Sequence, residues 1–195
     1  MARKTSLREF QQNVAQRIRD LALTKSVASK LGFQVGSENW LVTLSDVSEV
    51  IPAPKTIAVP LTLSWFRGVA NIRGKLYSVV DFAAFQGDSV IGPGMERRVI
   101  LIAERLIEGS GLMVSKMLGL RNPEQLTAEP MSGDSNDRPW VKAKYRDQAG
   151  VLWHELDVAA LVGNMRFLEV GSRGGDMTLN AAANTIAPSA TMSSR

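Results

Sequence analysis

The sequence predicts a mainly β protein built from two similar small units that follow one another along the chain. An internal repeat is the first sign: residues 74–87 and 150–163, which lie 76 positions apart, agree at six of fourteen positions. In both copies a turn glycine precedes a strand rich in β-branched and aromatic residues, and a short helix follows. Elsewhere the apolar segments are also short and bounded by glycine, proline and polar residues, as strands are. Chance recurrence of a common turn–strand–cap pattern is the alternative interpretation.

Glycine and aspartate set the boundaries within each copy. Gly74 supplies the positive φ that a tight turn after Arg73 needs. Asp81 stands where a helix would begin, since its carboxylate can accept the unpaired amide hydrogens of a first helical turn. A helix of one or two turns follows and ends at Gly87. Asp157 takes the same place in the second copy, so we interpret the two aspartates as helix caps rather than as a catalytic pair.

Residues 1–30 predict a basic amphipathic helix at the N-terminus. Residues 6–9 read Ser-Leu-Arg-Glu, a capping box in which each polar side chain satisfies the other's backbone amide. Apolar side chains recur at helical spacing at Leu7, Phe10, Val14, Ile18 and Leu21. Three interpretations stay open: a helix packed on its own domain, a helix that docks on a partner or a surface, and a mitochondrial transit peptide.

Further strands are predicted on both sides of the first copy. They cover residues 31–36 and 40–44, a second set at 97–103 and 111–118, and a closing hairpin at 140–146 and 150–156.

The segments between these strands are predicted to be irregular. Residues 45–51 are short, with Val47, Val50 and Ile51 spaced for one face, and the prolines that follow prevent regular pairing. Residues 122–137 are predicted to form a polar loop. Residues 169–195 offer little to bury, so we expect a disordered tail there.

Composition excludes several classes of protein. The chain has 195 residues, of which 45% are hydrophobic and 22% are charged, as is ordinary for a soluble globular protein. No apolar run approaches the roughly 18 residues of a membrane helix, and no secretory signal opens the chain. The chain lacks cysteine, which excludes disulfides, thiolate metal sites and cysteine nucleophiles. We therefore expect a cytoplasmic protein.

The positive charge is confined to the N-terminal segment. The pI is near 9.6, yet residues 1–30 hold seven Lys or Arg against two acidic residues, a net charge of +5. The remaining residues hold 16 Lys or Arg against 17 acidic residues, a net charge of −1. A nucleic-acid-binding domain usually carries a basic face on its fold, and the sequence reveals none here.

No set of residues indicates catalysis. His154 is the only histidine, and it alternates with Leu152 and Leu156, a pattern typical of a core or edge residue. One histidine without cysteine cannot build a zinc site, and neither a P-loop nor a dinucleotide-binding glycine motif is present. We expect no enzyme activity, no cofactor and no metal.

The turn at residues 71–74 predicts a binding surface instead. Asn71 and Arg73 place an amide and a long cation just before Gly74, where both can reach out of the fold. Arginine is favoured at interfaces because its guanidinium makes two parallel hydrogen bonds and its stem covers apolar surface. A solvated hairpin arginine without a partner is the alternative.

These residues are part of a longer pattern that resembles CheW-type chemotaxis adaptors. The pattern runs from Val59-Pro60 through Trp65-Phe66 to Gly-Val-Ala-Asn-Ile-Arg-Gly at 68–74 and Val-Val-Asp-Phe at 79–82. The resemblance covers residues 31–168. With the basic N-terminal helix and the Ala/Ser-rich tail, the closest branch resembles the PilI-type adaptors of type IV pilus twitching-motility systems.

The resemblance implies both a fold and partners. The fold would be two SH3-like five-stranded β-barrel subdomains that share an apolar seam, with short helices. The function would be that of a non-enzymatic adaptor between the cytoplasmic tip of a methyl-accepting chemoreceptor and the regulatory domain of a CheA-type histidine kinase. One barrel would meet the kinase, and a groove between the barrels would bind the receptor helix. Contact with the membrane would be indirect, through the receptor.

The resemblance also assigns residues. Arg73 matches the receptor-binding arginine of the family's Asn-x-Arg-Gly motif, and Glu49 matches the acidic residue that pairs with it. Val47 and Val50 match apolar receptor contacts. The predicted partner-binding residues are Glu49, Arg73, Asn71, Gly74, Val47 and Val50. Where the family often has proline in the following strand this chain has Ser78, which predicts a looser strand edge.

A small-barrel nucleic-acid-binding protein is the competing hypothesis. It would use the basic N-terminal helix and a stacking platform made by Trp40, Trp65, Trp140 and Trp153. Stacking platforms need aromatic side chains that are exposed next to cations. These tryptophans stand in apolar strand or loop-anchor segments, so no nucleic-acid partner is predicted.

Overall fold

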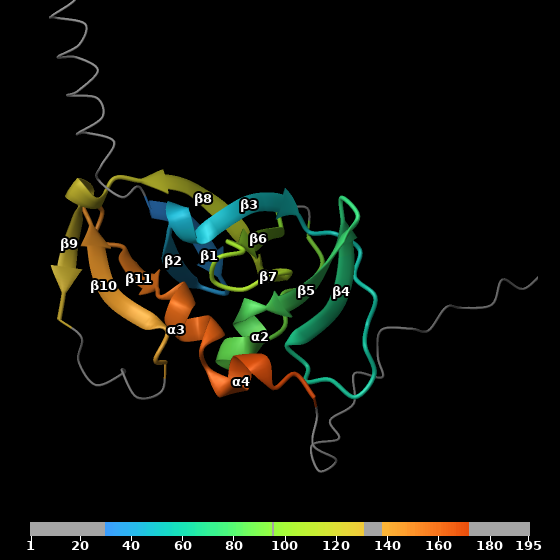
Figure 1. Ribbon diagram of the computed structural model, residues 1–195. Helices are drawn as coiled ribbons and strands as arrows, with labels where there is room; N and C mark the ends of the chain where they lie inside the picture. The colour runs from blue at the N-terminus through green and yellow to red at the C-terminus, as the bar shows by residue number, and fades with distance from the viewer. Residues whose placement is uncertain (1–29, 95, 131–137, 172–195) are drawn as a thin grey trace, which may run out of the picture.

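The computed structural model describes residues 30–94, 96–130 and 138–171. The helix predicted for residues 1–30 lies outside this part of the chain except for Lys30, which begins a strand. The tail predicted for residues 169–195 lies outside it from residue 172, and within the described part the Leu63 amide donates to the Val170 carbonyl at 2.9 Å. The described residues form two β-sheets with a few short helices, which confirms the mainly β prediction (Figure 1).

The first sheet contains the first copy of the repeat. Its five strands lie in the order β3-β6-β7-β5-β4. Their bounds are β3 (Val47–Pro52), β4 (Phe66–Ile72), β5 (Lys75–Asp81), β6 (Arg98–Ile102) and β7 (Ser110–Val114). Helix α2 (Phe82–Gln86) follows β5, and the 3₁₀ turn η1 (Leu44–Asp46) precedes β3.

The second sheet contains the second copy. Its six strands lie in the order β8-β1-β2-β11-β10-β9. Their bounds are β1 (Lys30–Val35), β2 (Glu38–Thr43), β8 (Lys116–Arg121), β9 (Leu126–Glu129), β10 (Val141–Asp147) and β11 (Leu152–Leu156). Helices α3 (Val158–Val162) and α4 (Met165–Leu168) follow β11, and the 3₁₀ turn η2 (Pro123–Gln125) precedes β9.

The two sheets share one pairing pattern. In the first sheet, β3, β6 and β7 are antiparallel neighbours, β7 runs parallel to β5, and β5 is antiparallel to β4. In the second sheet, β8, β1, β2, β11 and β10 repeat this sequence of pairings, and β9 adds a sixth strand beside β10. The internal repeat therefore describes the topology of the whole domain and not only the fourteen matched residues.

The two units exchange their first hairpins. Hairpin β1–β2 precedes the first copy in the chain, yet it pairs with β8 and β11 of the second sheet. Hairpin β6–β7 precedes the second copy, yet it pairs with β3 and β5 of the first sheet. The strands predicted at 97–103 and 111–118 are present as β6 and β7, but they complete the first sheet rather than begin a second set. Sequence order does not reveal which parallel partner a strand selects.

The predicted turn and caps are present. Arg73 and Gly74 have φ values of 53° and 85°, so both central residues of the β4–β5 turn are left-handed, as in a type I′ hairpin. The Asp81 carboxylate accepts the Ala84 amide at 3.1 Å, and the Asp157 carboxylate accepts the Ala160 amide at 2.9 Å.

The two helices end differently. Gly87 closes α2 with a φ of 97°, whereas Gly163 closes α3 with a φ of −80°. The shared glycine at the end of the repeat therefore does not mark a shared backbone conformation. At Gly163 a Cβ would lie 3.2 Å from the Ala159 carbonyl oxygen, so close packing rather than a left-handed turn favours glycine there.

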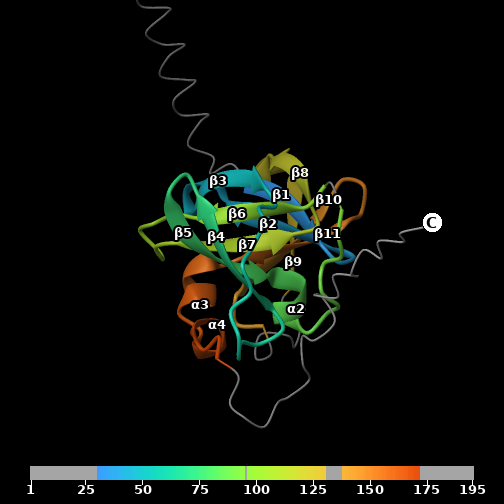
Figure 2. The same ribbon diagram turned by 90° about the vertical axis from the view of Figure 1, so that its right-hand side faces the viewer.

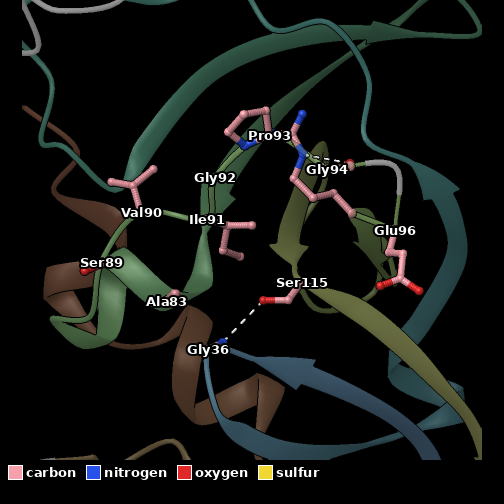
Figure 3. Close-up of a pocket in the computed structure, with 11 residues that line it drawn as sticks. Gly36, Ala83, Ser89, Val90, Ile91, Gly92, Pro93, Gly94, Glu96 and Ser115 are labelled. Carbon is pink, nitrogen blue, oxygen red and sulfur yellow. Dashed lines mark hydrogen bonds between the residues drawn. The ribbon is translucent and has the colours of Figure 1, made fainter.

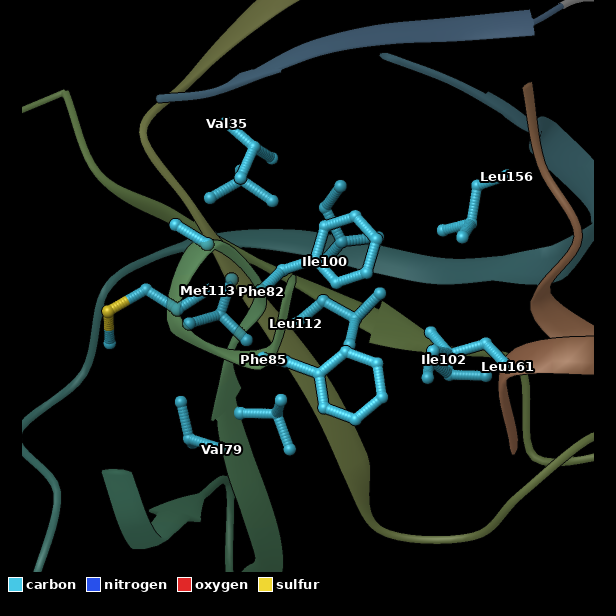
Figure 4. Packing of buried hydrophobic residues seen from close by; sticks show 14 of the residues in the cluster. Val35, Val79, Phe82, Phe85, Ile100, Ile102, Leu112, Met113, Leu156 and Leu161 are labelled. Atoms are coloured by element: carbon cyan, nitrogen blue, oxygen red, sulfur yellow. The ribbon is translucent and has the colours of Figure 1, made fainter. Parts of the chain in front are cut away.

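The core joins the two sheets through the first helix. Phe82 and Phe85 of α2 are fully buried and point among side chains of both sheets, including Ile100 of β6 and Leu156 of β11 (Figure 4). The Phe82 ring meets Trp40 of β2 edge-on, with centroids 5.1 Å apart. Because one cluster collects residues from both units, the shared apolar seam that the family resemblance implies is present.

Two further predictions need correction. The predicted loop at 122–137 contains η2 and β9 in its described part, because Asn122 caps the short turn and β9 pairs with β10. Ser78 does not loosen an edge, since β5 lies between β7 and β4 and the Ser78 amide donates to the Gly109 carbonyl at 2.7 Å. Proline could not make this bond.

Candidate functional site

Glu49 and Arg73 form a two-bonded ion pair on the surface of the first sheet. The Arg73 guanidinium donates to the two Glu49 carboxylate oxygens at 2.7 and 2.8 Å. Glu49 lies on β3, one edge of the sheet, and Arg73 lies in the turn that follows β4, the opposite edge. The sheet must therefore curl until its two edges meet at this end, and the pair joins them.

The turn holds Arg73 away from the body of the domain. The Asn71 side-chain oxygen accepts the Gly74 amide at 2.9 Å, so the amide side chain braces the turn from inside. The Arg73 side chain is 74% exposed, whereas the Glu49 side chain is 35% exposed. Glu49 therefore anchors the guanidinium on one side and leaves its other face open to a partner.

Apolar side chains on β3 adjoin this pair. Val47 and Val50 lie on the same strand as Glu49, and both are partly buried against the core. The fixed guanidinium is thus held by a strand that also carries partly buried valines, and interface anchors combine directional polar groups with apolar ones in this way. Of the six residues of the predicted site, Arg73 contacts Glu49 and Gly74 contacts Asn71, while Val47 and Val50 share strand β3 with Glu49.

Two more ion pairs surround the same end of the sheet. Lys75 donates to Glu104 at 2.8 Å, and Arg105 pairs with Asp46 of η1. Glu104 also raises the pKa of Lys75 above its ordinary value, chiefly through this hydrogen bond. Sequence reasoning missed these pairs, because nothing in the pattern shows that the β6–β7 loop packs beside the turn.

The equivalent turn of the second unit lacks the arginine. At 76 positions beyond Asn71 and Arg73 stand Asp147 and Ala149. The Asp147 carboxylate braces its turn by accepting the Ala149 and Val151 amides, both at 2.9 Å. The two turns thus use the same bracing position, and only the first has an arginine at the position between the brace and the glycine. Extending the repeat three residues before Gly74 would have found this contrast.

A cavity of about 500 Å³ opens beside the segment that joins β6 to α2 (Figure 3). It is lined by Gly36, Ala83, Ile91, Arg97 and Ser115 among others. The Gly36 amide donates to the Ser115 hydroxyl across its floor at 3.3 Å. Its charged lining residues are Glu96 and Arg97, and the Arg97 guanidinium donates to the Gly94 carbonyl at 3.3 Å.

The described residues offer little support for catalysis or nucleic-acid binding. His154 is 9% exposed and packs against Trp40 with ring centroids 5.2 Å apart. No group of three potential metal ligands occurs in the described part of the chain. All four tryptophans are buried, so they form no stacking platform. In the same residues, no helix is long and apolar enough to cross a membrane.

Comparison with known proteins identifies a family and a structural neighbour. Residues 30–165 match the model of the CheW-like domain. A crystal structure of the scaffolding protein TtCheW from Thermoanaerobacter tengcongensis superposes with a TM-score of 0.56 at 18% identity, over 67% of this chain and 88% of that one. At this identity the likeness shows the fold.

Curated relatives point the same way. Protein PilI of Pseudomonas aeruginosa is 31% identical over 145 residues, which are 73% of this chain and 79% of that protein. A chemotaxis protein CheW of Rhizobium meliloti is 25% identical over 115 residues, which are 59% of this chain and 74% of that protein.

Proposed function

The chain belongs to the CheW-like family, and from that premise we propose that it couples a methyl-accepting chemoreceptor to a CheA-type histidine kinase in the control of type IV pilus twitching motility. Members of this family are non-enzymatic scaffold proteins, so the chain is a scaffold adaptor rather than an enzyme. The similarity to PilI supports the pilus system, and a cytoplasmic location is part of the proposal.

The Glu49–Arg73 pair is the observation that carries the receptor side of the proposal. The pair lies on the surface, where such interactions contribute only about 0–1 kcal/mol to folding. Its geometry is nevertheless two-bonded, and the Asn71 brace fixes the turn behind it. An ion pair that is held so firmly and yet contributes little to folding stability is better explained by a role in binding. In that role it orients Arg73 toward a partner, and Val47 and Val50 supply apolar contacts.

The kinase would bind elsewhere on the domain. In the proposed complex the regulatory domain of the kinase, which resembles this chain, meets one of the two units, and the receptor helix lies in the groove between them. A single scaffold could then hold both partners at once, because the two contacts use different surfaces.

Binding to the receptor's cytoplasmic tip tests the proposal. Arg73→Glu would place two carboxylates opposite each other, and loss of an interface anchor worth about 2 kcal/mol weakens binding about 30-fold. We expect the variant to lose the receptor tip and to retain the kinase regulatory domain. Circular dichroism and the unfolding midpoint establish that the variant is folded.

Two controls sharpen this experiment. Arg146→Glu reverses an exposed arginine of the second sheet that is likewise paired, with Glu129 at 2.9 Å, and should leave receptor binding unchanged. The swapped double variant Glu49→Arg with Arg73→Glu restores the ion pair but moves the cation to β3, so it should recover stability without recovering binding. Capture of neither partner by the wild type, together with salt-sensitive binding of generic DNA, would overturn the proposal in favour of a nucleic-acid-binding barrel.

A further inference from the structure

The chain enters the domain beside two exposed leucines. Lys30, the first residue of β1, is in register with Thr43 of β2 on one side and with Arg121 of β8 on the other. Leu44 follows Thr43 and is 44% exposed, and Leu120 precedes Arg121 and is 63% exposed. The two leucines therefore flank the point from which the N-terminal segment departs.

This surface continues into the apolar seam. Leu120 is in register with Leu31, which is packed against the core, so the two side chains lie on the same face of the second sheet. Met117, on the same strand, is also partly buried against that core. Strands β3 and β8 both lie at the upper end of the molecule in Figures 1 and 2. We call Leu44, Met117 and Leu120 the entry patch.

Residues 1–29, which precede the described part of the chain, have the amphipathic sequence that could bind an apolar patch. Its stripe of five apolar residues runs from Leu7 to Leu21, and its other positions carry a net charge of +4 over residues 1–29. As a helix this stripe would be about 21 Å long, at 1.5 Å per residue. The eight residues 22–29 can span up to about 28 Å when extended. That is enough chain for the stripe to turn back onto the surface beside Lys30.

We propose that the N-terminal segment of this chain docks as an amphipathic helix on the entry patch. Its apolar stripe covers the leucines, and its basic residues face solvent. The occupant is this segment rather than a second molecule, because the connection through Lys30 keeps the stripe beside the patch at high effective concentration.

Docking there would regulate the proposed receptor site, and this consequence rests on the proposed function. Leu44 is the first residue of η1. Strand β3 begins directly after η1 at Val47, which is a predicted receptor contact. A docked helix would therefore compete with the receptor for the same end of β3. Receptor binding would displace the segment, and the segment would weaken receptor binding by the fraction of molecules in which it is docked.

Cross-linking tests docking without the receptor. The chain contains no cysteine, so a pair introduced at Val14→Cys and Leu120→Cys is the only one available to a short bismaleimide. We expect rapid intramolecular cross-linking of the full chain. Val14→Cys with Leu168→Cys is the matched control, because Leu168 is an exposed leucine on α4 at the other end of the molecule and should react at least several-fold more slowly (Figure 1). Equal rates for the two pairs, or dimers in place of monomers, would overturn the proposal.

Receptor titration tests the regulatory step. Val14→Glu interrupts the stripe, and Gln12→Glu adds the same charge off the stripe. If nine molecules in ten are docked, release raises the apparent affinity for the receptor tip about tenfold. We expect that gain for Val14→Glu and no change for Gln12→Glu. Failure of all variants to bind the receptor would contradict the proposed function alone, whereas receptor binding that Val14→Glu leaves unchanged would contradict the regulation.

Discussion

The interiors of the two units differ at one equivalent position. Val79 of β5 and Glu155 of β11 lie 76 residues apart and face equivalent parallel strands, opposite Gly111 and Leu41. Val79 is fully buried in the shared apolar core. Glu155 is 2% exposed and carries a carboxylate into the second unit. The same backbone therefore supports an apolar interior in one unit and an ionic one in the other.

The ionic interior is tolerated because it is partnered. Lys30 lies 2.5 Å from one Glu155 carboxylate oxygen, and Lys142 lies 3.8 Å from the same oxygen. The Tyr145 hydroxyl donates to the other oxygen at 2.8 Å. Burial and the adjacent carboxylate raise the pKa of Tyr145 to about 12, so the hydroxyl keeps its proton through the neutral range. A buried carboxylate is stable when each oxygen has a donor.

The largest expected effect comes from breaking the ionic interior on one side only. Lys30→Met leaves the buried Glu155 carboxylate with the Tyr145 hydroxyl and the more distant Lys142, and we expect a loss of about 3 kcal/mol in the free energy of unfolding. The double variant Lys30→Met with Glu155→Val gives the second unit the residue that the first unit has, and should lie within about 1 kcal/mol of the wild type. Urea unfolding measures both. A double variant that is no more stable than Lys30→Met would show that the second unit cannot accept the apolar residue of the first at this position.

The two helix caps should contribute different amounts to the free energy of unfolding. Asp81 is fully buried, and its second carboxylate oxygen also accepts the Ile91 amide at 2.9 Å, which fixes the chain after α2. Asp157 is partly exposed and caps α3 through Ala160. Asp81→Ala should therefore cost about 3 kcal/mol, since two buried amides lose a charged acceptor. Asp157→Ala should cost about 1 kcal/mol, as an ordinary cap does. Thermal unfolding of the two variants compares them directly, and equal losses would contradict the difference in burial.

The two turn braces should differ in their response to acid. Hydrogen bonds from the Trp153 indole and the Val151 amide hold the pKa of Asp147 below its ordinary value. Asp147 therefore stabilises the fold above its unfolded pKa of about 4, and this contribution is lost as pH falls through the lower folded pKa. Asn71 cannot titrate, so the first turn has no such dependence.

An Asp147→Asn variant isolates this effect. It should be less stable than the wild type at pH 6, and the difference should shrink as the pH approaches 2. Unfolding by urea at several pH values measures it, with Asn71→Ala as a variant whose difference from the wild type stays constant. If the stability difference between Asp147→Asn and the wild type also stays constant with pH, the charge of the Asp147 carboxylate does not stabilise the turn beyond what an amide oxygen provides.

The smallest effect on folding is expected at the proposed receptor site. Arg73→Ala gives the first turn the residue that the second turn has at Ala149, and it removes an exposed ion pair. We expect a change of less than about 1 kcal/mol in the free energy of unfolding. A loss above about 2 kcal/mol would mean that the pair closes the curled sheet rather than orienting a binding group.

Local features of the fold could be predicted from the sequence because they depend on near neighbours. The turn at Gly74 and the caps at Asp81 and Asp157 follow from the conformational freedom of glycine and from side-chain acceptors three residues away. The Glu49–Arg73 contact could be expected only through the family resemblance, because 24 residues separate the two side chains.

Long-range features could not be predicted in this way. The partner of β2 is β11, more than a hundred residues later, and no residue pattern in either strand specifies the other. Glu155 reads as a polar residue in an alternating strand, and its burial depends on Lys30 and Tyr145 from other strands. Strand β9 could not be predicted because Thr127 is the only strong strand former among its four residues.

The exchanged hairpins set the order in which the domain can be completed during synthesis. Hairpin β1–β2 leaves the ribosome early, but its parallel partner β11 ends at Leu156, which is 113 residues after Thr43. At about 5–20 residues per second, the ribosome needs roughly 6–23 seconds to make that stretch. During this interval β1 gains its partner β8 once Arg121 has been made, whereas the other edge of the hairpin, on β2, has no native partner. The edge of β2 therefore stays open to chaperones and to neighbouring chains until β11 has been made.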